Sequence, residues 1–232
     1  MMLFRYAFGV IALSGCGLIS SNAVTYDLDL PAQKFSVDAS GWQLSEKATS
    51  SYLSKSCVDT PTLCATAAAS ACPMNCTGTC DATSNTCDLG LEIAVHQTID
   101  LVSQKPELNN VDAATSILQV TVDSVTYEVS ANTLDYDTPE LAVYVAASSV
   151  MDPDDPAAHQ IGTIPLIAKG TTRTTAEMQF TERGQAQLTA TLSNFKNPFN
   201  VIVGGALKLS AGDPIPYGKL DANVTIRAHA SP

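Results

Sequence analysis

The sequence predicts a mainly β protein: an antiparallel β-sandwich, immunoglobulin-like or Greek-key, with a disulfide-rich insertion and one short helix. Two observations predict this fold class. Valine, threonine, serine and alanine are abundant whereas lysine, arginine and glutamate are scarce, and β-branched side chains pack well on a pleated sheet. In addition, many short segments alternate apolar and polar residues and are separated by turn residues, which is the pattern of a sandwich.

The first strands are predicted before the cysteine-rich segment. Apolar residues alternate with polar ones over residues 24–30 and predict a half-buried strand that Pro31 ends. Phe35 and Val37 continue the alternation. Trp42 is the only tryptophan, and we expect it to anchor the core because a lone aromatic side chain is usually buried. The polar residues 45–56 predict a short helix or a loop.

The longest strand is predicted over residues 91–101, with Val95 on the buried face and His96 on the solvated face. Residues 118–129 also alternate, but the phase slips at Asp123-Ser124. A β-bulge accounts for this slip without ending the strand. We therefore expect one long bulged strand here, with a tight hairpin as the alternative.

Further elements are predicted in the C-terminal half. Strands are expected over residues 141–147, 161–168, 178–180, 199–209 and 220–226. In the last of these, Ile226 is expected on the inner face and Arg227 is expected to point outward. The Gly204-Gly205 pair interrupts one of these patterns, which indicates a bulge or a point of close packing. Residues 184–195 fit a helix face and also a strand; we favour the helix, with Thr181 as its N-cap.

Six cysteines lie within one short segment, and the rest of the predicted domain contains no other cysteine. They are Cys57, Cys64, Cys72, Cys76, Cys80 and Cys87. An even number in an exported chain indicates three disulfides, although the spacing does not select one pairing. A zinc site is disfavoured because no Cys-x2-Cys pair occurs and the nearest histidine is His96. The intervening residues are small, so we expect this segment to add little to the core. A protease-resistant insertion is favoured slightly over a stapled recognition loop.

The N-terminus predicts export. Arg5 precedes a short apolar run, which ends in Leu13-Ser14-Gly15-Cys16. This order is that of a secretory signal, and the four residues resemble the lipobox of bacterial lipoproteins. The resemblance implies cleavage before Cys16 and lipid attachment to its side chain. Gly17, which is not acidic, implies delivery to the outer membrane. The alternatives are a secreted soluble protein and a transmembrane anchor, for which the apolar run is too short.

These observations predict a simple domain organisation. Residues 1–15 form the signal peptide, residues 16–23 a lipidated tether, and residues 24–232 a single β-sandwich domain with the cysteine-rich insertion at 57–87. No flexible linker and no internal repeat divides the body of the chain.

Charge restricts the partners. The formal net charge is −11 and the twelve basic residues form no cluster, so nucleic-acid binding is excluded because phosphates require lysine and arginine. The predicted partners are the membrane, through the N-terminal lipid, and an envelope or surface protein. No cofactor is predicted.

Motifs of catalysis are missing from the sequence. It contains no Gly-x-Ser-x-Gly and no His-Glu-x-x-His, and we assign no role to His96, His159 or His229. Two acidic loops remain. One contains Asp135, Asp137 and Glu140, and the other contains Asp152, Asp154 and Asp155. The second loop offers candidate calcium ligands, but neither loop has the EF-hand pattern, and we predict no metal.

The sequence therefore predicts a non-catalytic, lipid-anchored lipoprotein of the cell envelope, a binding or structural module presented at the outer membrane. Two alternatives remain. One is a hydrolase of envelope polymers that uses paired carboxylates as acid and base. The other is a calcium-dependent adhesion module.

Overall fold

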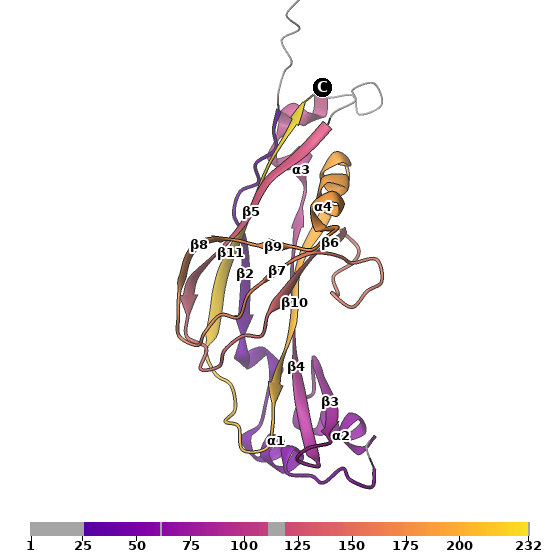
Figure 1. The fold of residues 1–232 in the computed structure, drawn as a ribbon, viewed down its shortest axis with the longest axis vertical. Coiled ribbons are helices and arrows are strands. Elements are labelled where there is room, and N and C mark those ends of the chain that lie inside the picture. Colours follow the sequence, from indigo (N-terminus) through magenta and orange to yellow (C-terminus); the bar gives the residue numbers. More distant parts are fainter. Residues whose placement is uncertain (1–25, 61, 111–118, 232) are drawn as a thin grey trace, which may run out of the picture.

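The computed structural model describes residues 26–60, 62–110 and 119–231. The predicted signal peptide, Cys16, the tether and Leu118 lie outside these described residues. The body is elongated, and its long strands run along its length (Figure 1).

Two antiparallel sheets form the body, which confirms the predicted β-sandwich. Sheet A has the order β1-β11-β5-β8, and β2 also pairs with β11. Its strands are β1 (Tyr26–Asp27), β2 (Gln33–Asp38), β5 (Gln119–Asn132), β8 (Arg173–Glu177) and β11 (Lys219–Ser231). Sheet B has the order β3-β4-β10-β6-β7-β9. Its strands are β3 (Cys76–Asp81), β4 (Thr86–Ile99), β6 (Leu141–Ala147), β7 (His159–Ile164), β9 (Gln179–Phe180) and β10 (Phe199–Leu209).

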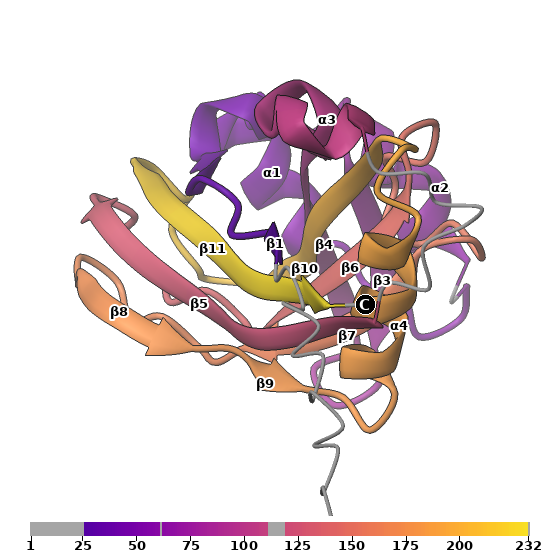
Figure 2. The same ribbon diagram turned by 90° about the horizontal axis from the view of Figure 1, so that it is seen from above.

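The chain passes from one sheet to the other at Met178. This buried residue separates β8 of sheet A from β9 of sheet B, and its N–H donates to the Val125 carbonyl at 2.9 Å. Figure 2 shows the two short strands following one another along one side of the sandwich. The crossing therefore connects the edge strand of sheet A with the edge strand of sheet B.

The inner and outer faces of the long strands follow the predicted alternation. Ile226 is 1% exposed and Arg227 is exposed. Val95 is half-buried and packs against the core, whereas His96 is exposed. The predicted registers of β11 and β4 are therefore confirmed, because a slip of one residue would reverse each pair.

Several predicted strands differ in detail. The bulge in β5 is confirmed: the register with β11 shifts between Arg227 and Ala228, and β5 continues through it. β10 is not interrupted, because Gly204 and Gly205 pair with β4 without a shift. β4 begins earlier than predicted and ends at Ile99. Residues 26–30 of the first predicted strand are described; β1 is the strand among them, and the N–H of Leu30 also donates to the Ile226 carbonyl of β11.

The described residues contain more helix than predicted. The helices are α1 (Glu46–Leu53), α2 (Leu63–Ala71), α3 (Leu101–Gln104) and α4 (Gly184–Ser193), with 3-10 turns at Ala39–Trp42 and Pro106–Asn110. The helix favoured over residues 184–195 is present as α4. Its N-cap is Arg183 and not Thr181, whose hydroxyl instead donates to the Gln160 carbonyl.

The six cysteines form three disulfides, as expected: Cys57–Cys80, Cys64–Cys87 and Cys72–Cys76. We call residues 46–87 the cysteine module; it consists of α1, α2, β3 and the start of β4. Cys64, Ala68 and Ala71 of α2 are buried and belong to the same apolar cluster as the sandwich core. The expectation that this segment adds little to the core is therefore wrong.

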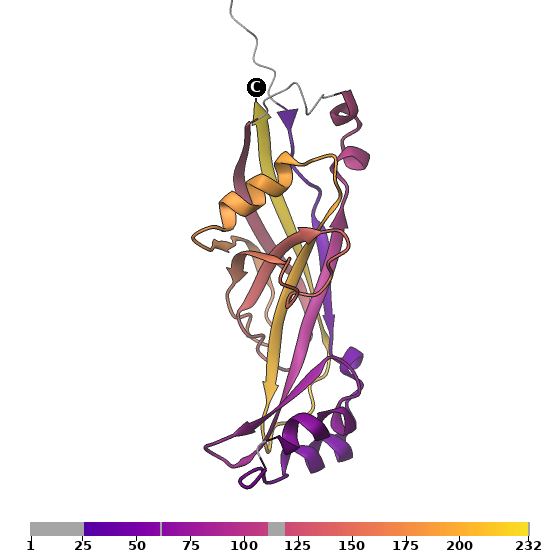
Figure 3. The same ribbon diagram turned by 90° about the vertical axis from the view of Figure 1, so that its right-hand side faces the viewer.

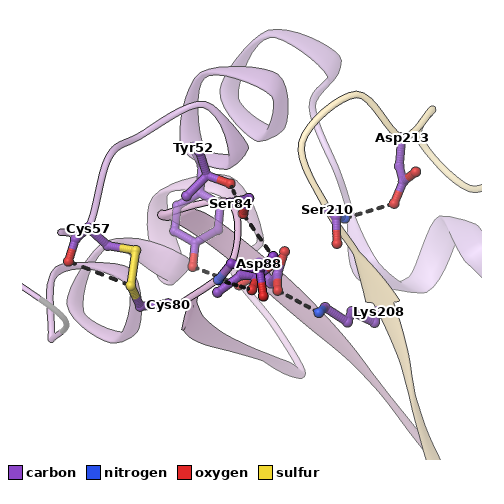
Figure 4. A network of polar contacts seen from close by, with 11 residues as sticks. Tyr52, Cys57, Cys80, Ser84, Asp88, Lys208, Ser210 and Asp213 are labelled. Atoms are coloured by element: carbon purple, nitrogen blue, oxygen red, sulfur yellow. Dashed lines mark hydrogen bonds and ion pairs between the residues drawn. A yellow bond between two sulfur atoms is a disulfide. The ribbon is translucent and has the colours of Figure 1, made fainter.

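A polar network joins the cysteine module to β10 (Figure 4). The Tyr52 hydroxyl lies 3.0 Å from the Cys64 carbonyl oxygen and 3.2 Å from that of Asp88. The Asp88 side chain is 3% exposed, and its Oδ2 lies 2.7 Å from Nζ of Lys208. Among the residues that the structure describes, none forms a hydrogen bond with Oδ1 of Asp88. The network therefore connects Tyr52 of the module, through Asp88 of β4, to Lys208 of β10.

The module occupies one end of the long axis. β1 and the end of β11 lie at the opposite end (Figures 1 and 3).

Candidate functional site: an acidic pocket on sheet B

A pocket of about 320 Å³ lies on the outer face of sheet B. Its floor crosses β4, β10 and β6, where side chains are short: Ala206 pairs with Glu92, and Gly204 pairs with Ala142. The complete lining is Thr77, Glu92, Glu140, Ala142, Tyr144, Pro153, Asp154, Gly204, Gly205 and Ala206. The pocket exists because small residues of the central strands face larger, acidic residues at the rim.

The loop between β6 and β7 covers one side of this pocket. The buried Asn200 of β10 holds it, because its Nδ2 donates to the carbonyls of Ser148 at 3.1 Å and Val150 at 2.7 Å. The Oδ1 of Asn200 accepts from the Thr98 hydroxyl at 2.6 Å. These bonds keep the loop on the outer face of the sheet.

Three carboxylates converge at the rim. One oxygen of each of Glu92, Asp152 and Asp154 lies within 4.8 Å of the other two. The loop is turned tightly here, since the Asp154 N–H donates to Asp152 Oδ1 at 2.8 Å. The result is a local concentration of negative charge from β4 and the β6–β7 loop.

The pKa values in the pocket respond to this environment. Burial raises the pKa of Glu92, and the charges of Asp152 and Asp154 raise it further. Burial also raises the pKa of Tyr144, with a contribution from Asp154. A cation bound among the carboxylates would remove their mutual repulsion.

Two hydrogen bonds hold the backbone of Glu92. Its N–H donates to the Asn75 carbonyl at 2.8 Å, and its carbonyl accepts from Trp42 Nε1 at 2.8 Å. Trp42 is 5% exposed, which confirms the prediction that it anchors the core. The cysteine module therefore contributes directly to one wall of the pocket.

Two of the three candidate calcium ligands reach the pocket rim. Asp152 and Asp154 join Glu92, but Asp155 does not. Oδ1 of Asp155 instead accepts from the Ala157 N–H at 2.8 Å. Asp155 thus stabilises the turn that follows and does not belong to the cluster.

The other acidic loop is mostly structural. Oδ1 of Asp135 accepts from the Tyr217 N–H, and Oδ1 of Asp137 accepts from the Lys169 N–H, each at 2.8 Å. Glu140 lines the acidic pocket. Sequence reasoning did not assign Glu92 to a site; its only signals were its place on the solvated face of β4 and the glycine pair of β10.

The three histidines lie outside the pocket lining. His96 and His159 are exposed, and Nδ1 of His229 lies 2.9 Å from Asp123 Oδ2 at the bulge of β5. None of these three histidines therefore lies among the carboxylates that line the acidic pocket.

No family model matches this chain, and neither a curated protein nor a solved structure is significantly similar to it. Within the described ranges, no helix combines the length and the apolar character that a bilayer crossing requires.

Proposed function

We propose that this protein is a non-catalytic, lipid-anchored binding module of the bacterial cell envelope, attached to the outer membrane. The observation that carries the proposal is that β1 and the cysteine module lie at opposite ends of the elongated body. β1 is the described element nearest the predicted lipidated tether, and it lies at the end opposite the cysteine module (Figure 3). Anchoring through Cys16 therefore holds the cysteine module away from the membrane.

The body between these ends suits a rigid spacer. β4 alone contains 14 residues, which corresponds to about 45 Å of extended chain. Three disulfides close the outer end, as is common in oxidising compartments outside the cytoplasm. An envelope or surface protein is the partner expected at that end.

Membrane fractionation tests the anchor. We expect Cys16→Ser to move the protein out of the membrane fraction or to leave it uncleaved, because the acyl chains would be missing. Ser14→Ala is the matched control, since it keeps a small residue and the cysteine. Recovery of Cys16→Ser in the membrane fraction at the normal mature mass would contradict the proposal.

Calcium-dependent binding is the second candidate, and the convergence of Glu92, Asp152 and Asp154 favours it. Calcium takes six to eight oxygen ligands, so water or partner oxygens would complete the coordination. We expect calcium to raise the melting temperature of the wild type and of Asp155→Asn, but not that of Glu92→Gln. Equal responses in all three proteins would reject this candidate.

Hydrolysis by paired carboxylates has less support. A pocket lined with acidic side chains is one requirement for it, but the three oxygens gather within 4.8 Å. Such a convergence of three carboxylate oxygens suits a cation, which takes several oxygen ligands at once, whereas glycoside hydrolysis uses two carboxyl groups that flank the scissile bond.

A further inference from the structure

We propose that the Cys72–Cys76 disulfide is a redox-sensitive latch that positions Glu92 in the acidic pocket. When it is oxidised, it holds the turn whose Asn75 carbonyl binds the Glu92 N–H. When it is reduced, the turn is released and the pocket wall loosens. The expected effect on ligand affinity rests on the calcium binding proposed above, whereas the effect on the Glu92 backbone does not.

The latch closes a very short turn. Cys72 is the C-cap of α2 and Cys76 is the first residue of β3, a separation of 4 in the sequence. Asn75 has a left-handed backbone with φ of 57°. Its carbonyl accepts from Glu92 one position beyond the last β3–β4 pair, Cys76 with Leu91. This hydrogen bond therefore depends on the turn keeping its shape.

A second connection reaches the other side of Glu92. Cys72 Sγ lies 3.6 Å from the carbonyl oxygen of Trp42, and Trp42 Nε1 donates to the Glu92 carbonyl at 2.8 Å. Nε2 of Gln43 lies 3.8 Å from Sδ of Met74 in the turn. The N–H of Glu92 is thus bound by Asn75, which lies in the turn that the disulfide closes. The carbonyl of Glu92 is bound by Trp42, whose own carbonyl oxygen lies beside Cys72.

The other two disulfides are suited to holding the module together. Cys64 and Cys87 are both fully buried, and Cys57 is 1% exposed. Each of these bonds joins residues separated by 23 positions. Cys76, in contrast, is half-buried beside an exposed turn of Pro73, Met74 and Asn75. Cys80 is half-buried as well, and Cys72 is 2% exposed, so the short span and the exposed turn distinguish the latch. Opening it releases only the few residues between Cys72 and Cys76, and the longer links keep the module folded.

The redox step requires a dithiol reductant. Its thiolate attacks Sγ of Cys76 and forms a mixed disulfide, while the Cys72 sulfur leaves as a thiolate and takes up a proton. The second thiol of the reductant then displaces Cys76 and forms the reductant's own disulfide. Two electrons pass to the protein, which gains two thiols.

Graded reduction of the wild-type protein with dithiothreitol tests the latch. Alkylation and mass spectrometry identify which cysteines are reduced first, and hydrogen exchange measures protection of the Glu92 amide. Emission of Trp42, the only tryptophan, gives an independent signal. We expect Cys72 and Cys76 to be alkylated first, with at least tenfold faster exchange at Glu92 and a shifted emission. The Cys72→Ser/Cys76→Ser variant should show the same changes without reductant.

Two outcomes would overturn the latch: reduction of another pair first, or reduced Cys72 and Cys76 with unchanged Glu92 exchange and Trp42 emission. A calcium titration separates the two proposals. Weaker calcium binding in the reduced protein supports both. Faster exchange at Glu92 with no calcium binding in either redox state supports the latch and rejects the calcium site.

Discussion

Pro153 packs directly onto Gly204: a Cβ added at Gly204 would lie 2.7 Å from Cβ and 2.9 Å from Cγ of Pro153. Pro153 is buried and lies between Asp152 and Asp154 in the sequence. The missing side chain at position 204 therefore allows the loop to place two carboxylates beside Glu92. Gly204 acts here through close packing, since β10 pairs regularly on both sides of it.

Gly204→Ala should displace this loop. The added methyl group overlaps Pro153, so we expect a loss of about 1–3 kcal/mol in the free energy of unfolding, typical of overpacking, and a smaller stabilisation by calcium. Urea denaturation with and without calcium measures both. Gly41→Ala is the control, because a Cβ there meets nothing within 4 Å. If the two variants behaved alike, the packing of Pro153 on Gly204 would not determine the loop position.

The Lys208–Asp88 pair gives a prediction of pH dependence. The hydrogen bond to Asp88, together with the attraction of its charge, raises the pKa of Lys208 above 10.5. A raised lysine pKa means that the folded state holds the proton more tightly, so the pair stabilises the protein at neutral pH. That stability disappears as the pH rises through the raised pKa.

Lys208→Met should therefore lower stability at neutral pH, and the difference from the wild type should shrink above pH 10.5, the ordinary lysine value. Urea denaturation over this alkaline range checks the trend. Lys34→Met is the control, since Lys34 is exposed and forms no ion pair among the described residues. A pH-independent loss would mean that packing of the lysine stem matters more than its charge.

The alternation of apolar and polar residues predicted much of the fold. Strand faces repeat every two residues, so the alternation along β4 and β11 placed Val95 and Ile226 on their inner faces. The phase slip at Asp123 predicted the β5 bulge for the same reason. α2 was missed because its alanines were treated as filling between cysteines, although alanine has the highest intrinsic helix propensity.

The sequence indicated only part of the acidic pocket. Asp152 and Asp154 are close in the chain, and their loop attracted notice by its charge. Glu92 lies far from them in sequence and joins them because β10 lies between β4 and β6 in sheet B and the β6–β7 loop packs on β10 at Gly204. Alternation places a side chain on a face but does not say which loop covers that face. The disulfide pairing was equally inaccessible, because spacing alone does not select partners.

Aspartate substitutions at Ile226 and Val95 compare the cost of a charge at a fully buried position with its cost at a half-buried one. Ile226→Asp places an unpaired charge where the side chain is 1% exposed, so we expect a loss of more than about 4 kcal/mol or failure to fold. Val95→Asp should cost less, because Val95 is only half-buried. Thermal unfolding gives the comparison.

The neighbouring outward residue provides the control. Arg227→Ala should change the free energy of unfolding by less than about 0.5 kcal/mol, since Arg227 is exposed. A larger effect of Arg227→Ala than of Ile226→Asp would mean that the side chains of β11 face the opposite way.

The three disulfides should contribute unequally to stability. Cys64–Cys87 links residues separated by 23 positions, and Cys72–Cys76 by 4. Loop-closure entropy predicts losses of about 3.4 kcal/mol for Cys64→Ala/Cys87→Ala and about 1.9 kcal/mol for Cys72→Ala/Cys76→Ala. Urea denaturation of the oxidised double variants measures these values.

Cys57–Cys80 is the internal comparison for loop length. It has the same separation as Cys64–Cys87, but Cys80 is half-buried whereas Cys64 and Cys87 are fully buried. Removing Cys57–Cys80 should therefore cost the loop entropy with a smaller cavity penalty, which places it between the other two. If removing Cys72–Cys76 cost the most, the short link would be holding the module together, and its opening would unfold the module and not only release Glu92.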